Sequence, residues 1–202
     1  MGRNRTLTAH VVGVLAVQGG FAAHARMLTS LGMRVVEVRL PQHLDACEAL
    51  VLPGGESTTI IRLMQRYGLV DAIVTRAQGG MPIFGTCAGL ILLSKAVESG
   101  AEQGGQTTLG ILDVVVARNS FGRQVDSFES TLDIHGLIEP LNAVFIRAPS
   151  IKKVGPGVDV LATIGDDIVM VRSGVIIGAA FHPELSGDSR VHEMFLGLIS
   201  GG

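Results

Sequence analysis

The first half of the chain alternates between continuous apolar runs and amphipathic stretches. Continuous apolar runs are typical of strands that are buried on both faces of a parallel sheet. We predict such strands at residues 11–17, 33–38, 49–52 and 81–84. Helical spacing predicts helices over residues 21–31, 69–78 and 90–96, and a further helix, capped by Ser57 or Thr58, whose apolar face carries Ile60, Leu63, Met64 and Tyr67. This alternation predicts right-handed βαβ crossovers and a doubly wound sheet.

The second half of the chain is rich in strands. Strand-like segments occupy residues 109–117, 127–134, 144–146, 158–163, 168–172 and 175–181. We expect some of these strands to pair antiparallel. A closing helix at about residues 189–199 should pack Val191, Phe195 and Leu198 inward. The predicted fold class is therefore α/β: a doubly wound, mostly parallel sheet flanked by helices, with an antiparallel extension in the C-terminal half.

Composition and charge favour a single cytoplasmic domain. The 202 residues are 47% hydrophobic, and their number fits one domain at residues 11–202 behind an N-terminal extension at residues 1–10. Lys plus Arg number 16 against 18 Asp plus Glu, without a long run of either sign, so nucleic acid is not an expected partner. Two cysteines, Cys47 and Cys87, are too few for a disulfide framework and suit a reducing compartment.

The N-terminus loosely imitates a secretory signal, because Arg3 and Arg5 precede the apolar run at residues 11–17. That run is short and contains Gly13, and no small-residue cleavage site follows it. A buried first strand is the better interpretation. No apolar run approaches the length needed to span a membrane, so we do not expect a membrane partner.

The segment Gly85-Thr86-Cys87-Ala88-Gly89 predicts a nucleophile elbow, since a buried strand must turn there abruptly into a helix. Small residues are needed two positions before and after the nucleophile, where strand and helix cross closely. The helix N-terminus also favours a thiolate. A lone cysteine is usually a buried structural residue, but the elbow context favours a catalytic nucleophile at Cys87.

A proton carrier for this thiol is predicted in His182-Pro183-Glu184, which follows the strand at residues 175–181. Pro183 should hold His182 extended, so that Glu184, two residues on, projects to the same side and orients the imidazole. Alone, such a tripeptide is equally compatible with an ordinary turn. Together with the elbow it predicts a Cys-His-Glu triad.

Oxyanion donors are predicted on both sides of the nucleophile. Pro53-Gly54-Gly55 ends a strand and precedes a helix, so that the N–H groups of Gly54 and Gly55 can be presented freely, and Ala88 follows the nucleophile at a helix start. Considered alone, the glycines also fit an ordinary strand-to-helix turn.

Other candidate residues carry weaker signals. Cys47 has no basic neighbour in the sequence and is interpreted as structural. The histidines outside the triad show no metal-ligand spacing and are interpreted as surface or internally satisfied residues: His10, His24, His43, His135 and His192. Gln18-Gly19-Gly20 lacks a full dinucleotide fingerprint, and the Gly- and Gln-rich segment at residues 99–108 is interpreted as an exposed loop of little chemical interest. Neither a metal nor a cofactor is expected.

These motifs resemble those of class I (triad) glutamine amidotransferases, and most closely the glutaminase subunits of pyridoxal phosphate synthase. The resemblance spans about residues 11–199 and rests on the segments at residues 53–59, 84–90, 118–129, 145–149 and 181–185. The segment at residues 118–129, RNSFGRQVDSFE, decides the subfamily. Family members usually carry Leu-Gln-Gly after the first strand, where this chain has Val17-Gln18-Gly19.

The resemblance implies a glutaminase in which Cys87 is the nucleophile, His182 the general base and acid, and Glu184 its orienting partner. It also implies a glutamine pocket lined by Gly55, Glu56, Ser57, Arg118, Ile146 and Arg147. An arginine of this pocket can bind the α-carboxylate of glutamine, and a carboxylate can bind its α-ammonium group. Ammonia would pass to a (β/α)-barrel synthase subunit that makes pyridoxal phosphate.

Three alternative functions stay open from the sequence. The chain could be a glutaminase subunit of a different biosynthetic amidotransferase. It could also be a docking subunit without catalytic activity, or a Cys peptidase or DJ-1-like protein on a related sheet.

Overall fold

The computed structural model describes residues 9–98, 106–118 and 127–199. Its helices are α1 (Phe21–Ser30), α2 (Ser57–Arg66), α3 (Leu69–Gln78), α4 (Ala88–Leu93) and α5 (Arg190–Leu196), with 3₁₀ turns η1 (Pro41–Leu44) and η2 (Pro183–Leu185). Its strands are β1 (Val11–Leu15), β2 (Arg34–Val38), β3 (Ala49–Leu52), β4 (Ile83–Thr86), β5 (Ser94–Glu98), β6 (Leu112–Ala117), β7 (Ser127–Leu132), β8 (Leu141–Ile146), β9 (Ser150–Val154), β10 (Asp159–Ile164), β11 (Asp167–Ser173) and β12 (Ile176–Ala179).

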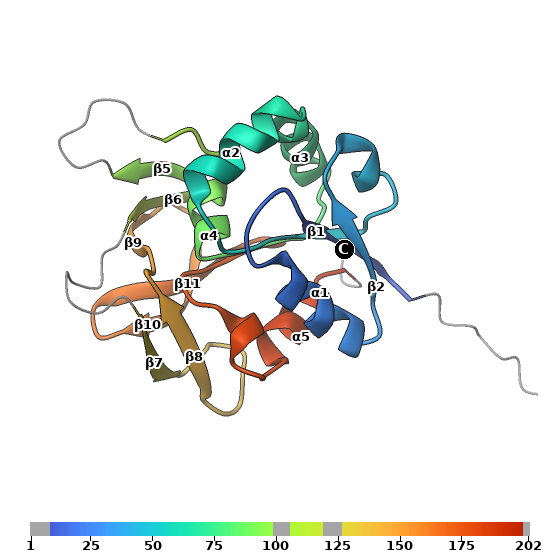
Figure 1. Ribbon diagram of the computed structural model, residues 1–202. Coiled ribbons are helices and arrows are strands. Elements are labelled where there is room, and N and C mark those ends of the chain that lie inside the picture. Colours follow the sequence, from blue (N-terminus) through green and yellow to red (C-terminus); the bar gives the residue numbers. More distant parts are fainter. Residues whose placement is uncertain (1–8, 99–105, 119–126, 200–202) are drawn as a thin grey trace, which may run out of the picture.

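The main sheet lies between two layers of helices. Its strand order is β2-β1-β3-β4-β12-β11-β9-β6-β5, with β10 paired to β11. Helices α2, α3 and α4 lie on one face, and α1 and α5 on the other (Figure 1). Strands β1 to β4 and β12 pair in parallel, as the continuous apolar runs predict. Their carboxyl ends therefore lie along one edge of the sheet.

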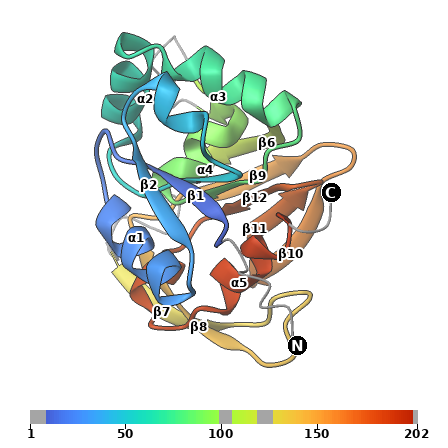
Figure 2. The same ribbon diagram turned by 90° about the vertical axis from the view of Figure 1, so that its right-hand side faces the viewer.

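The C-terminal half supplies the predicted antiparallel extension. Strand β11 pairs antiparallel with β9, β10 and β12, and β7 and β8 form a separate two-stranded sheet. In Figure 2 this small sheet lies at the end of the molecule remote from α2 and α3. A backbone hydrogen bond of 2.8 Å from His182 N to Val144 O joins it to the segment after β12.

Two of the predictions for individual elements are wrong, and one strand was not predicted. The helix expected over residues 90–96 ends at Leu93, and the following residues form β5, where Ser94 and Ala96 pair with β6. Strand β9 has no predicted counterpart. Tyr67 lies beyond the end of α2 and is 41% exposed, whereas Ile60 and Met64 of that helix are fully buried.

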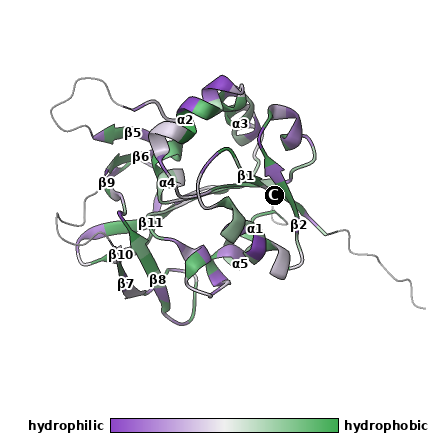
Figure 3. Cartoon of the chain, viewed as in Figure 1, coloured by the Kyte–Doolittle hydropathy of each residue, from purple (hydrophilic) through white to green (hydrophobic). Residues whose placement is uncertain are grey.

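The core follows the central strands. In Figure 3 the strands of the main sheet are mostly hydrophobic, and α2 and α3 mix both kinds of residue. The largest fully buried side chains include Phe84, Phe181 and Phe195, so α5 packs its Phe195 against the sheet as predicted, together with Val191. No helix in the described part of the chain combines the length and apolar character needed to cross a membrane.

Candidate active site

Cys87 occupies a strained turn between β4 and α4. Its φ of 50° and ψ of −105° are unusual for a non-glycine residue and cost about 1–3 kcal/mol. The Cys87 N–H donates to Ala179 O at 2.8 Å, which ties the turn to β12. A Cβ at Gly85 would lie 2.7 Å from the backbone carbon of Gly89, and a Cβ at Gly89 would collide with the Leu52 carbonyl. The small residues of the elbow are therefore required by packing.

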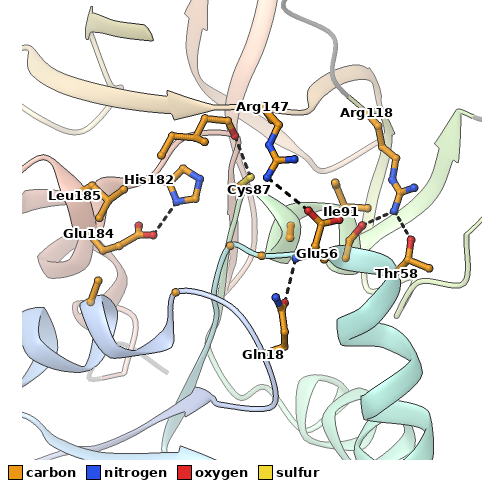
Figure 4. A pocket seen from close by; sticks show the side chains of 17 residues that line it. Gln18, Glu56, Thr58, Cys87, Ile91, Arg118, Arg147, His182, Glu184 and Leu185 are labelled. Atoms are coloured by element: carbon orange, nitrogen blue, oxygen red, sulfur yellow. Dashed lines mark hydrogen bonds and ion pairs between the residues drawn. The ribbon is translucent and has the colours of Figure 1, made fainter. Parts of the chain in front are cut away.

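The pairing of β4 with β12 brings His182 to the nucleophile. Ala179 lies beside Thr86 in this parallel pair, so the residues that follow both strands meet at one sheet edge. The imidazole of His182 lies beside Cys87 in Figure 4, and the nearby thiol acts to raise the pKa of this ring. The His182 side chain is only 11% exposed.

Glu184 completes the arrangement from the turn η2. Its Oε1 lies 2.8 Å from Nδ1 of His182, and its side chain is 2% exposed. The expected pairing of Glu184 with His182 is present, but a 3₁₀ turn creates it rather than an extended strand, because the chain bends immediately at Pro183.

The two buried groups stabilise opposite charges on each other. Burial opposes charge on His182, but hydrogen bonds with Cys87 and Glu184 outweigh it and raise the pKa of His182 to about 10. Burial likewise opposes charge on Glu184, yet the hydrogen bond from His182 and the ion-pair contact with His24 hold the pKa of this carboxyl well below its usual range. The ring is therefore a cation and the carboxyl an anion at neutral pH.

Gly54 lies between the histidine and the thiol. A Cβ at this position would collide with Cε1 of His182 and would lie 3.4 Å from Cβ of Cys87. Only glycine therefore leaves room for the approach of these two side chains at the end of β3.

Two of the backbone N–H groups predicted as oxyanion donors belong to residues that line the same cavity as Cys87. Gly20 N donates to Gly54 O at 2.9 Å. Because the C=O and N–H of a trans peptide point in opposite directions, the Gly55 N–H is directed away from Gly20. Ala88 is the first residue of α4, so its N–H has no partner within the helix. The N–H groups of Gly55 and Ala88 are thus available to an oxyanion.

A cavity of about 470 Å³ opens above these groups (Figure 4). This volume is within the range of small-molecule sites. Every residue predicted for catalysis, the oxyanion and the substrate lines it: Gly54, Gly55, Glu56, Ser57, Cys87, Ala88, Arg118, Ile146, Arg147, His182 and Glu184. The structure therefore brings together residues from five separate segments.

Charged groups stand at the mouth of the cavity. Arg147 Nη2 lies 3.6 Å from Glu56 Oε1, and both side chains are largely exposed. Arg147 also has a positive φ of 43°, which is uncommon for a non-glycine residue. Ile146 O lies 3.8 Å from the Sγ of Cys87. The turn after β8 therefore contacts both the thiol and the charged rim.

Arg118 explains why the expected helix cap is absent. Its Nη2 donates to Ser57 Oγ at 2.6 Å and to Thr58 Oγ1 at 2.7 Å. Helix α2 has Glu56 as its N-cap, with no side-chain capping bond, so the predicted cap at Ser57 or Thr58 is wrong. The hydroxyl groups hold the guanidinium instead.

Two glutamines that the sequence left without a role also contact the site. Gln18 Oε1 accepts from Glu56 N at 3.1 Å and lines the cavity. Gln106 Oε1 contacts both Ser57 Oγ and Arg118 Nη2, so the interpretation of residues 99–108 as chemically irrelevant is wrong at this residue. Residues 99–105 lie outside the described residues, as do residues 119–126 of the segment that decides the subfamily.

Two histidines dismissed from the sequence are completely buried beside the triad. His24 and His192 each have no exposed surface, so neither is a surface residue. His24 Nε2 lies 3.3 Å from Glu184 Oε2. A sequence signal existed for His24, because it precedes the buried Leu28 by four residues on the inward face of α1.

The remaining polar candidates lie away from the site. Cys47 is buried, its Sγ lies 3.2 Å from His43 O, and it does not line the cavity. No group of three or more metal-ligating side chains occurs within residues 9–98, 106–118 and 127–199.

A parallel sheet that presents Cys, His and Glu at the carboxyl ends of its strands, above a cavity of amino-acid size, has the architecture of class I glutamine amidotransferases. The chain belongs to the SNO glutamine amidotransferase family, whose profile matches residues 14–200. This match confirms the predicted resemblance.

Similar proteins cover nearly the whole chain. The pyridoxal 5′-phosphate synthase subunit PdxT of Herpetosiphon aurantiacus is 54% identical over 93% of this chain and 99% of that protein. The same subunit of a Nocardioides species is 49% identical over 96% and 98%.

Solved structures confirm the predicted fold class. A crystal structure of a glutamine amidotransferase is 48% identical, with a TM-score of 0.88 over 93% of this chain and 98% of that chain. The structure of PurLQS from Thermotoga maritima is 19% identical, with a TM-score of 0.70 over 95% and 99%. The latter likeness concerns the fold alone.

Proposed function

We propose that the protein is the glutaminase subunit of a pyridoxal 5′-phosphate synthase, hydrolysing L-glutamine to glutamate and ammonia. The observation that carries this proposal is the meeting of Cys87, His182 and Glu184 at one end of a cavity of about 470 Å³. The family membership and the names of the PdxT relatives support it.

The charges around the cavity suit a free amino acid. An arginine can bind an α-carboxylate, and a carboxylate can bind an α-ammonium group. Arg118 and Arg147 supply the first kind of group, and Glu56 the second. Bound glutamine would thus be held by its backbone charges at the rim, with its side-chain amide extending toward Cys87.

The first half of the reaction is acyl transfer to sulfur. The Cys87 thiolate attacks the side-chain carbonyl carbon, and N–H groups of Gly55 and Ala88 stabilise the oxyanion of the tetrahedral intermediate. His182, protonated beside the carboxylate of Glu184, gives a proton to the departing nitrogen. Ammonia leaves, and a γ-glutamyl thioester remains on Cys87.

The second half is hydrolysis of that thioester. His182, now neutral, takes a proton from a water molecule, which attacks the thioester carbonyl. Collapse of the second tetrahedral intermediate breaks the C–S bond, returns its electron pair to sulfur and releases glutamate. The Cys87 thiolate and the protonated His182 are then restored. No cofactor takes part in these steps, and the chain itself need not bind a sugar phosphate.

A partner synthase would consume the ammonia. By its likeness to PdxT subunits, the protein is proposed to work with the (β/α)-barrel subunit of pyridoxal phosphate synthase. We expect weak glutaminase activity in the isolated chain and higher activity in the complex.

Replacement of the nucleophile tests this function. Cys87→Ala should lower glutamate and ammonia release by at least about 1,000-fold, because the covalent route is lost. The measurement is turnover of isotope-labelled glutamine, with and without the barrel subunit, and circular dichroism checks that the variant is folded. Unchanged turnover would refute the assignment.

Two further readouts separate the alternatives. Diazo-oxo-norleucine, a glutamine-like electrophile, should form an adduct at Cys87, and absence of the adduct would favour a non-catalytic docking subunit. Stimulation of turnover by the pyridoxal phosphate barrel subunit, but not by synthase subunits from other pathways, separates the proposed role from a glutaminase of a different pathway.

A further inference from the structure

Two buried histidines extend the triad away from the cavity. His24 of α1 places Nε2 at 3.3 Å from Oε2 of Glu184 and at 3.1 Å from Oγ1 of Thr86. Its other nitrogen, Nδ1, lies 3.0 Å from Nε2 of His192 on α5. These two helices lie on the same face of the sheet (Figure 1). A continuous row of polar groups therefore runs from α5 through α1 to the catalytic carboxyl.

The hydrogen-bonding capacity of these groups determines where the protons are. An ionised Glu184 can only accept, so His24 Nε2 must carry a proton, which Glu184 and the Thr86 hydroxyl share. Sharing explains why Glu184 Oε2 has an ion-pair contact but no well-aligned hydrogen bond among the described residues.

The position of the proton on His192 determines the direction in which the hydrogen bonds are donated. His192 Nδ1 has no hydrogen-bond partner among the described residues, and a proton there would be a buried unpaired donor. Its proton therefore belongs on Nε2, where it is donated to His24 Nδ1. Both rings then donate toward Glu184.

Nearby aromatic packing holds the rings in place. Phe84 of β4 meets the edge of the His24 ring at 6.4 Å and of the His192 ring at 5.8 Å between centroids. Phe84 lies three residues before Cys87, so the same strand supports the histidine pair and carries the nucleophile. This packing fixes the orientation of each ring.

We propose that His24 and His192 are positioning residues of the glutaminase site, forming a proton-ordered chain that holds one oxygen of Glu184 so that the other fixes the His182 ring against Cys87. This inference rests on the proposed function. Burial and the neighbouring His24 lower the pKa of His192 to about 3, against the effect of Glu184, which agrees with a neutral ring at the end of the chain.

The test replaces the donor with an apolar group of similar size. His24→Leu, assayed in complex with the synthase barrel subunit, should lower kcat for glutamine hydrolysis about 10- to 100-fold, the loss typical when a residue that orients a functional histidine is removed. KM should change by less than about two-fold, because His24 does not line the substrate cavity. His24→Gln retains an N–H near the position of Nε2 and should restore most of kcat. Unchanged kcat in His24→Leu, or an equal loss in both variants, would overturn the proposal.

A double-mutant cycle separates positioning from general packing. If His24 acts through Glu184, adding His24→Leu to Glu184→Gln should lower kcat much less than it does in the wild type. If the fold-loss of kcat in the double variant equals the product of the losses in the two single variants, the proposal is contradicted. Leu28→Val is the matched control, since Leu28 lies one turn further along α1 and is equally buried. It should lower Tm while kcat stays unchanged.

His192→Leu provides an independent check with a smaller expected loss. Without the donor from His192, His24 can take the other tautomer, in which Nε2 no longer donates to Glu184. If His192→Leu lowers kcat less than His24→Leu does, the result supports the proposed chain of hydrogen bonds. A larger loss would contradict the proposal that His192 donates to His24, which donates to Glu184. Wild-type protein that releases no ammonia would refute the proposed function itself, whereas active wild type with unaffected variants refutes only this inference.

Discussion

Cys47 and Cys87 are both buried, unpaired thiols, but they lie at opposite ends of neighbouring strands. Cys47 precedes β3, at the amino ends of the parallel strands, and its Sγ lies 3.2 Å from the carbonyl oxygen of His43. Cys87 follows β4, at the carboxyl ends, in a strained turn at the start of a helix. Burial is therefore common to both thiols, whereas the strained turn at a helix start is found at Cys87.

The electrostatic surroundings of the two thiols differ as well. Burial raises the pKa of the Cys47 thiol, although Arg76 and Arg34 act in the opposite direction. Cys87 instead contacts the imidazole of His182, which Glu184 holds in its charged form. Within the described residues, Cys87 therefore has a neighbouring side chain that can carry a proton, whereas the hydrogen-bond partner of Cys47 is a backbone carbonyl. This difference predicts how each region responds to chemical and mutational change.

The largest expected difference is in thiol reactivity. At neutral pH, iodoacetamide should modify Cys87 at least about 100-fold faster than Cys47, because the thiolate reacts and burial suppresses it at Cys47. Peptide mass spectrometry after timed labelling measures both rates. Cys47→Ala should retain full glutaminase activity and the same Cys87 labelling rate. Comparable rates at the two thiols would remove the distinction between these regions.

Glycine-to-alanine changes next to each thiol should differ in their effect on catalysis. A Cβ at Gly89 collides with the backbone carbonyl of Leu52, which cannot move without displacing the elbow. A Cβ at Gly13 meets the side chains of Cys47 and Val38, each at 2.9 Å, and these can shift. Both variants should lose about 1–3 kcal/mol of unfolding free energy. Only Gly89→Ala should also lose most of kcat.

Urea unfolding and glutamine turnover of the two glycine variants provide the measurement. Equal loss of kcat in Gly13→Ala would show that the elbow is no more sensitive to displacement than the remote strand.

The smallest expected effect is the pH dependence of stability that is caused by His192, which lies behind the triad on the same side of the molecule as Cys87. The pKa of His192 is lowered to about 3 in the fold by burial and His24, while the unfolded chain takes up this proton near the ordinary value of 6.5. Because the unfolded state then binds more protons at this site, the contribution of His192 to the free energy of unfolding falls as the pH drops from about 7.5 toward 3. His192 contributes up to about 2 kcal/mol of this loss between pH 7.5 and 5.

Urea titrations of wild type and His192→Leu at pH 7.5 and 5 measure this contribution. Glu184 is present in both proteins, so its own contribution to the pH dependence cancels in the comparison of wild type with His192→Leu. The free energy of unfolding of the wild type should fall relative to that of the variant over this interval. Parallel losses in the two proteins would exclude a buried neutral His192.

Local patterns were sufficient for much of the fold. The helix predicted at residues 69–78 and the strand at residues 49–52 have the same bounds in the structure, because both combine a clear apolar period with turn residues at their ends. Strand β5 was predicted as part of a helix, since Ser94, Lys95 and Ala96 carry no strong local preference. Pairing with β6 places them in the sheet, and such pairing is a tertiary contact that no local window contains.

The proposed triad was accessible from the sequence because its members lie in two short motifs, the elbow around Cys87 and His182-Pro183-Glu184. The histidines behind it were not, because a single histidine on an amphipathic helix has no distinctive neighbours. His24 and His192 are 168 residues apart and acquire meaning only when α1 and α5 pack on the same face of the sheet. Gln106 was missed for the same reason, since its contact with Arg118 joins two segments that no local pattern links.

The amino-acid sequence by itself determined the α/β class, the elbow at Cys87 and the family of the protein, because apolar period, glycine spacing and short motifs act over a few residues. Only the tertiary structure decided that η2, rather than an extended strand, brings Glu184 to His182, and that two distant helices place His24 and His192 behind it. Such contacts depend on the packing of whole elements against a sheet, and their energies are summed over side chains far apart in the chain.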